Sequence, residues 1–288
     1  MGSPMTAINL ESKMPNDISI EVRNMTFELE KVLATDWADN DPFLTAVFNA
    51  MSISFPSGER NFIESVRAYE DRIKDPKLAS DVKAFYQQEA IHSREHRKYN
   101  TLLCQQRGYD LASLERVYLS RLESSTKNPR VTPRINLAST VSIEHFTAIL
   151  GESILEGRLL KSMPRAVAEL WQWHALEELE HKSVAFDVYN QIGGSYKMRA
   201  AVMRIAMLTL FKDMLSVVVK MLRHDKQLWK WKTFRSFSKF LFSKGGFIRS
   251  HIPAYKAFFQ EDFHPSEIDN QSLLKSWQEK LQPAVTAV

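Results

Sequence analysis

Apolar side chains recur at intervals of three and four residues through most of the chain between Asp41 and Gly194. This spacing places them on one face of an α-helix, because the helix completes a turn about every 3.6 residues. No convincing pair of alternating segments joined by a tight turn occurs, so no hairpin is predicted. The pattern predicts an all-α chain in which only residues 18–30, ISIEVRNMTFELE, alternate enough to be extended.

Proline marks where the long helices begin, since it fits the first helical turn and the residue before it can cap the helix. Such pairs are Asp41-Pro42, Asp75-Pro76 and Thr132-Pro133, and Pro164 opens a fourth helix. We expect Pro56-Ser57-Gly58 to break or kink the first helix, because proline lacks the backbone donor. The predicted helices cover about 42–73, 76–108, 133–157 and 164–193, with a shorter helix at about 111–125.

Each of the four long helices carries a seam that is apolar at both ends and polar in the middle. Two seams contribute one glutamate, and two contribute a glutamate followed three residues later by a histidine. In chain order these residues are Glu59, Glu89 with His92, Glu144, and Glu178 with His181. Residues three apart share a helix face, so these polar groups are predicted to point into a bundle.

Four carboxylates cannot share a dry core without compensating charge. A buried ion-pair network is one solution, but no Lys or Arg occupies the seam positions. Two single glutamates and two Glu-x-x-His pairs are the ligand set of di-iron and di-manganese carboxylate bundles. Glu59 precedes Glu89 by 30 residues and Glu144 precedes Glu178 by 34, each about one helix hairpin. The sequence therefore predicts a dinuclear metal centre.

Further polar residues lie close to these seams. His174 lies one helical turn before Glu178 and is predicted to be a seventh ligand. His96 lies one turn after His92, and Glu177 lies beside the seam; both are predicted to hydrogen-bond to the ligands from behind. Tyr99 could add a hydrogen bond there or pack in the core.

Mixed glutamate and histidine ligation suits iron or manganese, so two iron ions are expected, with manganese or zinc as alternatives. Iron can reduce O₂ and support hydroxylation, desaturation or N-oxygenation, whereas a redox-inert ion can hold a hydroxide for hydrolysis. Glu144 and Glu178 are the expected catalytic carboxylates. We expect Glu144 and one of Glu59 or Glu89 to bridge the two ions.

Composition removes several other classes of protein. Nine glycines and a single cysteine, Cys104, supply no nucleotide-binding loop, nucleophile elbow, paired-cysteine zinc site or disulfide framework. The hydrophobic fraction of 44% is ordinary for a soluble globular protein. Met1–Pro4 looks like an expression scar, and no secretion signal follows it. A cytoplasmic location is therefore expected.

Charge is distributed unevenly along the chain. The formal net charge is +4, yet residues 195–256 hold 14 Lys and Arg against two acids, a local net charge of +12 that leaves the remainder near −8. Residues 198–223 are apolar but interrupted by charged side chains, so we do not expect them to span a membrane. The following stretch, KQLWKWKTFRSFSKFLFSKGGF, mixes aromatic and basic residues.

This basic segment, residues 198–256, suggests several partners. It could lie on an anionic membrane surface, placing the protein at the inner face of the membrane, or bind an acidic carrier protein. It could also form a homodimer contact or cover the bundle with a solvated face. Nucleic acid is not expected, since no recognition motif accompanies the charge.

Four blocks, residues 41–73, 88–100, 143–152 and 173–196, resemble in order the bacterial family of predicted metal-dependent hydrolases, a ferritin-like group. The resemblance implies a metal-binding bundle. The run of His174, Glu178 and His181 is also similar to that of p-aminobenzoate N-oxygenases, which implies that His174 binds a metal ion.

We therefore expect a ferritin-like four-helix bundle over 41–194, preceded by an extension over 1–40 and followed by basic helices over 195–288. The leading hypothesis is a di-iron oxygenase or desaturase acting on a small apolar substrate, such as a lipid or acyl chain, with a separate electron donor. A metal-dependent hydrolase and a non-catalytic metal-storage bundle are the alternatives.

Overall fold

The computed structural model describes residues 19–29, 32–160 and 162–281, and within these ranges it contains helices and no strand. The predicted expression scar at Met1–Pro4 lies outside the described residues. The α-helices are α1 (Pro42–Arg67), α2 (Pro76–Arg107), α3 (Leu111–Lys127), α4 (Pro133–Leu155), α5 (Arg165–His181), α6 (Val184–Gln191), α7 (Tyr196–His224), α8 (Trp231–Phe242), α9 (Phe247–Ala257) and α10 (Gln271–Lys280). Short 3₁₀ turns occupy Glu70–Arg72 and Pro265–Glu267. The all-α class is confirmed.

Side-chain caps begin the first helices where the sequence predicts them. Asp41 accepts hydrogen bonds from the backbone N–H groups of Phe43 and Leu44, which helix geometry otherwise leaves without partners. Asp75 caps α2 and Thr132 caps α4 in the same way. These local contacts confirm the predicted starts.

Of the break or kink predicted at Pro56-Ser57-Gly58, the break is wrong, because α1 continues through Pro56 to Arg67. Proline cannot donate to the carbonyl of Ser52, four residues earlier. The side-chain amide of Asn100 in α2 donates to that carbonyl instead, at 2.9 Å. The neighbouring helix therefore supplies the hydrogen bond that proline removes.

The fourth predicted helix is divided in the structure. α5 ends at His181 and α6 begins at Val184, with Lys182 and Ser183 between them. No glycine or proline lies between the two helices, so the sequence carries no breaker signal there.

Two buried apolar clusters flank the predicted polar layer. One contains Phe48, Tyr99 and Trp171, and the other contains Phe85 and Leu137. On α1 the first cluster precedes Glu59 and the second follows it, and on α2 the order around Glu89 is reversed, so the polar groups lie at mid-height in the bundle.

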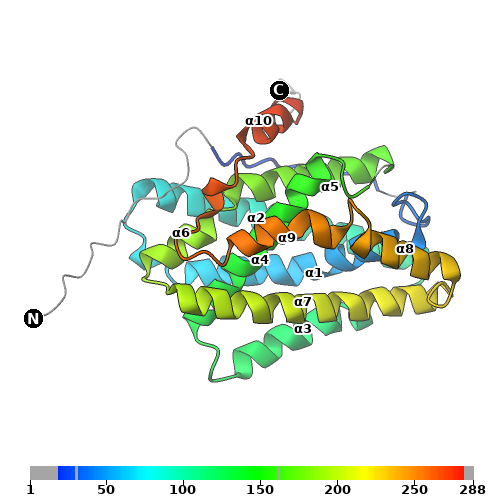
Figure 1. Cartoon of the computed structure of the whole chain (residues 1–288), viewed down its shortest axis with the longest axis horizontal. Coiled ribbons are helices and arrows are strands. Elements are labelled where there is room, and N and C mark those ends of the chain that lie inside the picture. Colours follow the sequence, from blue (N-terminus) through cyan, green and yellow to red (C-terminus); the bar gives the residue numbers. More distant parts are fainter. Residues whose placement is uncertain (1–18, 30–31, 161, 282–288) are drawn as a thin grey trace, which may run out of the picture.

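The C-terminal helices cover the bundle. α7 runs along α1 and α4, and α3 packs against both α1 and α7 (Figure 1). α8 and α9 return across the same side, where α8 contacts α1 and α9 contacts α4. Within the described residues, no helix has both the length and the continuous apolar character needed to cross a bilayer.

Candidate metal centre

The seven residues predicted as ligands converge between α1, α2, α4 and α5, and each is at most 4% exposed. Their donor atoms form three overlapping groups, within each of which all atoms lie within 4.8 Å of one another. The groups are Glu59 with His92 and His174, Glu89 with Glu144 and His181, and Glu89 with His92 and Glu178. The layer can therefore hold more than one metal ion.

His181 lies at the centre of one group. Its Nε2 is 3.2 Å from Glu89 Oε1 and 3.3 Å from Glu144 Oε2. In the adjacent part of the layer, Nε2 of His174 donates to Glu178 Oε1 at 3.0 Å. Four helices thus deliver carboxylate and imidazole donors to one small volume.

Many of these buried atoms lack a hydrogen-bond partner within the described part of the chain. They are both carboxylate oxygens of Glu59, Glu89 and Glu144, Oε2 of Glu178, Nδ1 of His92 and Nε2 of His181. No described Lys or Arg lies within ion-pair distance of the four glutamates, so the structure offers no ion-pair network to balance them. Unpaired buried carboxylates are costly, and bound cations would satisfy them. The donor set therefore fits a pair of metal ions.

The pKa values of the four glutamates also favour a bound cation. Burial, reinforced by repulsion from neighbouring carboxylates, raises the pKa values of Glu59 and Glu89 well above the ordinary glutamate value. Burial also raises the pKa of Glu144 to about 7. Burial opposes ionisation of Glu178, but the hydrogen bond from His174 and the electrostatic attraction of the nearby His181 outweigh it and lower that pKa. A divalent cation would favour the ionised form of all four.

His92 and His181 are each oriented by a hydrogen bond on the side of the ring that faces away from the carboxylate layer. Nε2–H of His92 donates to Glu177 Oε2 at 2.9 Å, which leaves Nδ1 free to face the carboxylate layer. Nδ1–H of His181 donates to Gln88 Oε1 at 2.9 Å, which leaves Nε2 facing the same layer. Each imidazole is thereby held in the tautomer that a metal ion requires.

His96 contacts a predicted ligand, whereas Tyr99 does not. His96 Nε2 lies 2.8 Å from His174 Nδ1, so this residue backs a predicted ligand. Tyr99 donates instead to Asn49 Oδ1 at 2.6 Å and packs in the apolar cluster. Among the described contacts it has no hydrogen bond to a predicted ligand, which favours the packing interpretation of this residue.

Sequence reasoning missed Arg23. This buried side chain forms ion pairs with Glu180 at 2.8 Å and with Glu177 at 3.4 Å. Gln88 donates to the same Glu180 while holding His181, so an ordered network connects the N-terminal segment to the ligands. One sequence feature could have indicated a buried cation here. Glu177 and Glu180 lie in a run flanked by large apolar residues, so they were candidates for burial and needed a positively charged partner.

A cavity of about 840 Å³ lies between α1, α3, α4 and α7 and reaches the carboxylate layer. Glu59 and Glu178 form part of its wall. Most of the remaining wall is apolar, and it includes Phe55, Phe62, Ile143, Phe146 and Leu210. The carboxylate layer therefore borders a largely apolar compartment on one side.

A family model described as "Predicted metal-dependent hydrolase" matches residues 21–269. No curated protein and no solved structure matches the chain. The match covers every helix that contributes to the carboxylate layer and to the cavity.

Proposed function

Because the chain belongs to the family of predicted metal-dependent hydrolases, we propose that it is a dinuclear metalloenzyme whose reaction is the oxidation of an apolar substrate by O₂. The ions, iron in the first place, would be held by Glu59, Glu89, His92, Glu144, His174, Glu178 and His181. Bound iron would supply the redox chemistry. An electron donor would restore it between turnovers.

The cavity is the observation that carries this proposal. Glu59 and Glu178 form part of the wall of a compartment large enough for a hydrocarbon chain or ring system, and most of that wall's surface is apolar. A C–H bond of an apolar substrate needs no hydrogen-bond donors around it. Hydrolysis instead develops negative charge on an oxygen in the transition state, which the bound ions or polar groups of the wall would have to stabilise.

Side chains of the cavity would bind the substrate, and residues behind the carboxylate layer would orient the metal ligands. Phe55 and Phe62 from α1 and Phe146 from α4 would hold the substrate beside Glu178 and exclude water. Glu177 would keep the imidazole of His92 in one tautomer. Glu144 and Glu178 remain the proposed catalytic carboxylates: Glu178 lines the cavity, and Glu144 lies in the same carboxylate layer, 3.3 Å from His181 Nε2.

Hydrolysis is the second candidate, and it agrees with the family's description. The cavity wall also carries polar and charged side chains, among them Ser54, Asn61, Asn136, Ser139, Arg121 and Lys197. Asn61 and Asn136 hydrogen-bond to each other at 3.3 and 3.2 Å. These amides could accept or donate to an ester or amide group if such a substrate enters.

Metal analysis combined with O₂ consumption tests the proposal. The protein would be loaded anaerobically with Fe(II), Mn(II) or Zn(II), desalted and analysed for metal, and the Fe(II) form mixed with O₂ in an oxygen electrode. We expect about two ions per chain and O₂ uptake by the iron form. Glu178→Ala and His181→Ala should lose both.

Glu95→Gln is the matched control, because Glu95 lies in α2 but pairs with Arg94 and Lys98 outside the carboxylate layer. It should retain metal and O₂ uptake. Two bound ions without O₂ uptake would favour hydrolysis. Absence of stoichiometric metal in every loading would contradict both proposals.

A further inference from the structure

One end of the molecule exposes aromatic side chains in a basic surrounding. Trp229 in the turn between α7 and α8 is 91% exposed, and on α8 Trp231, Phe242 and Phe234 are 74%, 61% and 57% exposed. The turn lies at one extreme of the molecule along its longest axis (Figure 1). Large aromatic side chains are seldom left this accessible without a partner.

The other face of α8 is fixed to the bundle. Phe237 and Phe240 make edge contacts with Phe43 at the start of α1, with ring centroids 5.6 and 5.8 Å apart. The hydroxyl of Thr233 donates to the carbonyl of Gln227 at 2.8 Å. Because these residues face inward, helical spacing directs Trp231, Arg235 and Phe242 outward together. α8 is therefore an anchored helix with a free aromatic and basic outer face.

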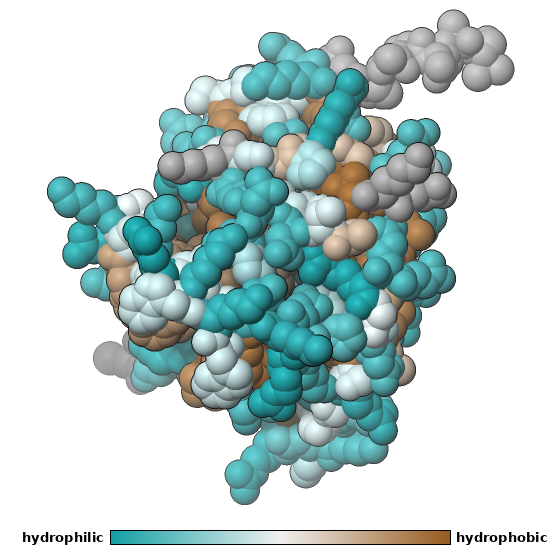
Figure 2. All heavy atoms as spheres, turned by 90° about the vertical axis from the view of Figure 1, so that its right-hand side faces the viewer, coloured by the Kyte–Doolittle hydropathy of each residue, from teal (hydrophilic) through white to brown (hydrophobic). Residues whose placement is uncertain are grey.

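Cations surround these aromatic groups and lack acidic partners. Among the described residues, no carboxylate lies within ion-pair distance of any Lys or Arg from 223 to 244. These cations are Arg223, Lys226, Lys230, Lys232, Arg235, Lys239 and Lys244. Figure 2, which faces this end of the molecule, shows hydrophilic side chains over much of the surface with paler side chains between them.

The two acids of the basic segment are already paired elsewhere. Asp225 accepts from Arg107 at 3.1 Å and also from Tyr109. Asp213 forms a two-point ion pair with Arg121 in α3. Neither carboxylate offsets the positive charge of α8, so this end of the protein presents a concentrated positive field.

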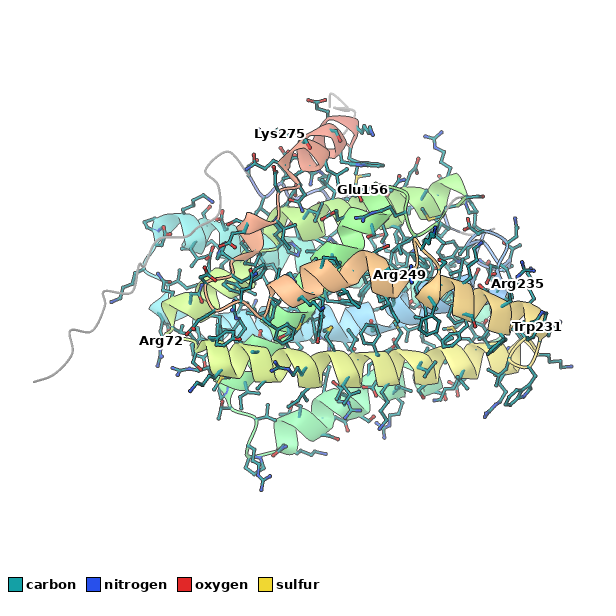
Figure 3. The ribbon with its side chains drawn as sticks, viewed as in Figure 1. Arg72, Glu156, Trp231, Arg235, Arg249 and Lys275 are labelled. Atoms are coloured by element: carbon teal, nitrogen blue, oxygen red, sulfur yellow. The ribbon has the colours of Figure 1, made fainter. Side chains whose placement is uncertain are left out.

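We propose that this surface docks on an anionic lipid bilayer. We call it the aromatic-basic face and define it by Trp229, Trp231, Phe234 and Phe242 together with Lys226, Lys230, Lys232, Arg235 and Lys239. Tryptophan and phenylalanine partition into the headgroup region, and nearby Lys and Arg attract anionic lipid. Trp231 and Arg235 lie together at the α8 end, as Figure 3 shows.

Charge favours a lipid surface over a second copy of the chain. A symmetric dimer through this face would bring two clusters of unpaired cations together, which costs free energy. An anionic bilayer has the opposite charge and also accepts the aromatic rings. The inference rests on this surface alone and does not depend on the reaction at the metal centre.

Vesicle binding tests the proposal with the full chain. Sedimentation with vesicles of equal parts phosphatidylcholine and phosphatidylglycerol would be compared with vesicles of phosphatidylcholine alone. We expect binding only to the anionic vesicles, weakening as salt is raised, with a blue shift of tryptophan emission. Trp37, Trp171 and Trp173 are buried and Trp277 is half-buried, so the shift would report mainly on Trp229 and Trp231.

Two variants separate the contributions of charge and aromatic rings. Lys230→Gln/Lys232→Gln/Arg235→Gln should weaken binding by about tenfold or more. Trp229→Ser/Trp231→Ser should weaken binding and abolish the blue shift. The matched control is Arg72→Gln/Lys74→Gln, which removes exposed cations at the opposite end of the molecule (Figure 3) and should bind as the parent does. Circular dichroism would verify that each variant is folded.

Several results would overturn the proposal. Equal binding to neutral vesicles, or equal loss of binding in the Arg72 and Lys74 control, would show that this surface is not the docking site. Absence of binding to anionic vesicles would do the same. Self-association that the tryptophan variant abolishes, in protein that ignores vesicles, would assign the face to a second copy.

Discussion

A Cβ atom on Gly151 would stand 2.9 Å from the backbone carbonyl oxygen of Ala175, so α4 and α5 meet at a distance that glycine permits and alanine does not. These two helices carry Glu144, Glu178 and His181. Because the obstructing atom belongs to the backbone, a side chain at this position must displace a helix.

Gly151→Ala is therefore expected to lower the free energy of unfolding by about 1–3 kcal/mol and to reduce metal occupancy. Gly58→Ala is the control, since a Cβ atom there meets nothing within 4 Å in the middle of α1. That change should be neutral or stabilising, because alanine is the better helix former. Urea unfolding of both variants without metal checks the prediction; equal effects would contradict it.

Removal of Arg23 should destabilise the fold strongly. Arg23→Met leaves Glu177 and Glu180 buried without their cation, and breaking such an arrangement costs about 3–5 kcal/mol. Arg94→Gln removes a half-exposed arginine that pairs with Glu95, and it should cost less than about 1 kcal/mol. Chemical denaturation measures both. A small effect of Arg23→Met would show that the two glutamates protonate without consequence for stability.

Acid should weaken the contact between α4 and α9. His145 donates to the carbonyl of Ala254 at 3.0 Å, and His251 lies 2.8 Å from Ser153 Oγ. Burial lowers the pKa of His145 to about 4 and also lowers the pKa of His251. The unfolded chain therefore binds these protons first as the pH falls.

The contribution of His145 to stability is then fully present above about pH 6.5 and declines as the pH falls through about 4. Its loss amounts to about 3 kcal/mol. The measurement is the difference in unfolding free energy between the parent and His145→Gln across this range. That difference should shrink toward low pH, and a constant difference would contradict the prediction.

Cys104 should react slowly with thiol reagents while the protein is folded. The side chain is buried, and burial raises its pKa to about 12, so little thiolate exists near neutral pH. Reaction with Ellman's reagent at pH 8 should be slow in native protein and fast in denaturant, with one thiol released per chain. Rapid reaction of the native protein would show that α2 opens locally.

The sequence predicted the helix starts well because their signals are local. Asp41, Asp75 and Thr132 cap the turns that directly follow them. Pro56 was misjudged because its effect depends on Asn100, a residue on another helix. The break after His181 has no local signal, so the apolar periodicity predicted α5 and α6 as one continuous helix.

Helical periodicity also placed the glutamates and histidines on inward faces, and the structure brings them together. It could not locate Arg23, because that residue lies in a segment without helical period and meets partners more than 150 residues away. Periodicity also could not predict the cavity beside Glu59 and Glu178, because its wall combines side chains from helices far apart in sequence. The assignment of each residue as a ligand remains a prediction until metal is measured.

The position of Arg23 also determines how late in synthesis the N-terminal segment can dock on α5. Glu180 follows it by 157 residues, so at about 5–20 residues per second the carboxylate is made about 10–30 s after the arginine. The ribosome must also complete α5 before Glu178 and His181 exist to join Glu59 and Glu89. The donor set is therefore complete only after 181 of the 288 residues have been made, and the N-terminal segment can dock only when the set is nearly complete.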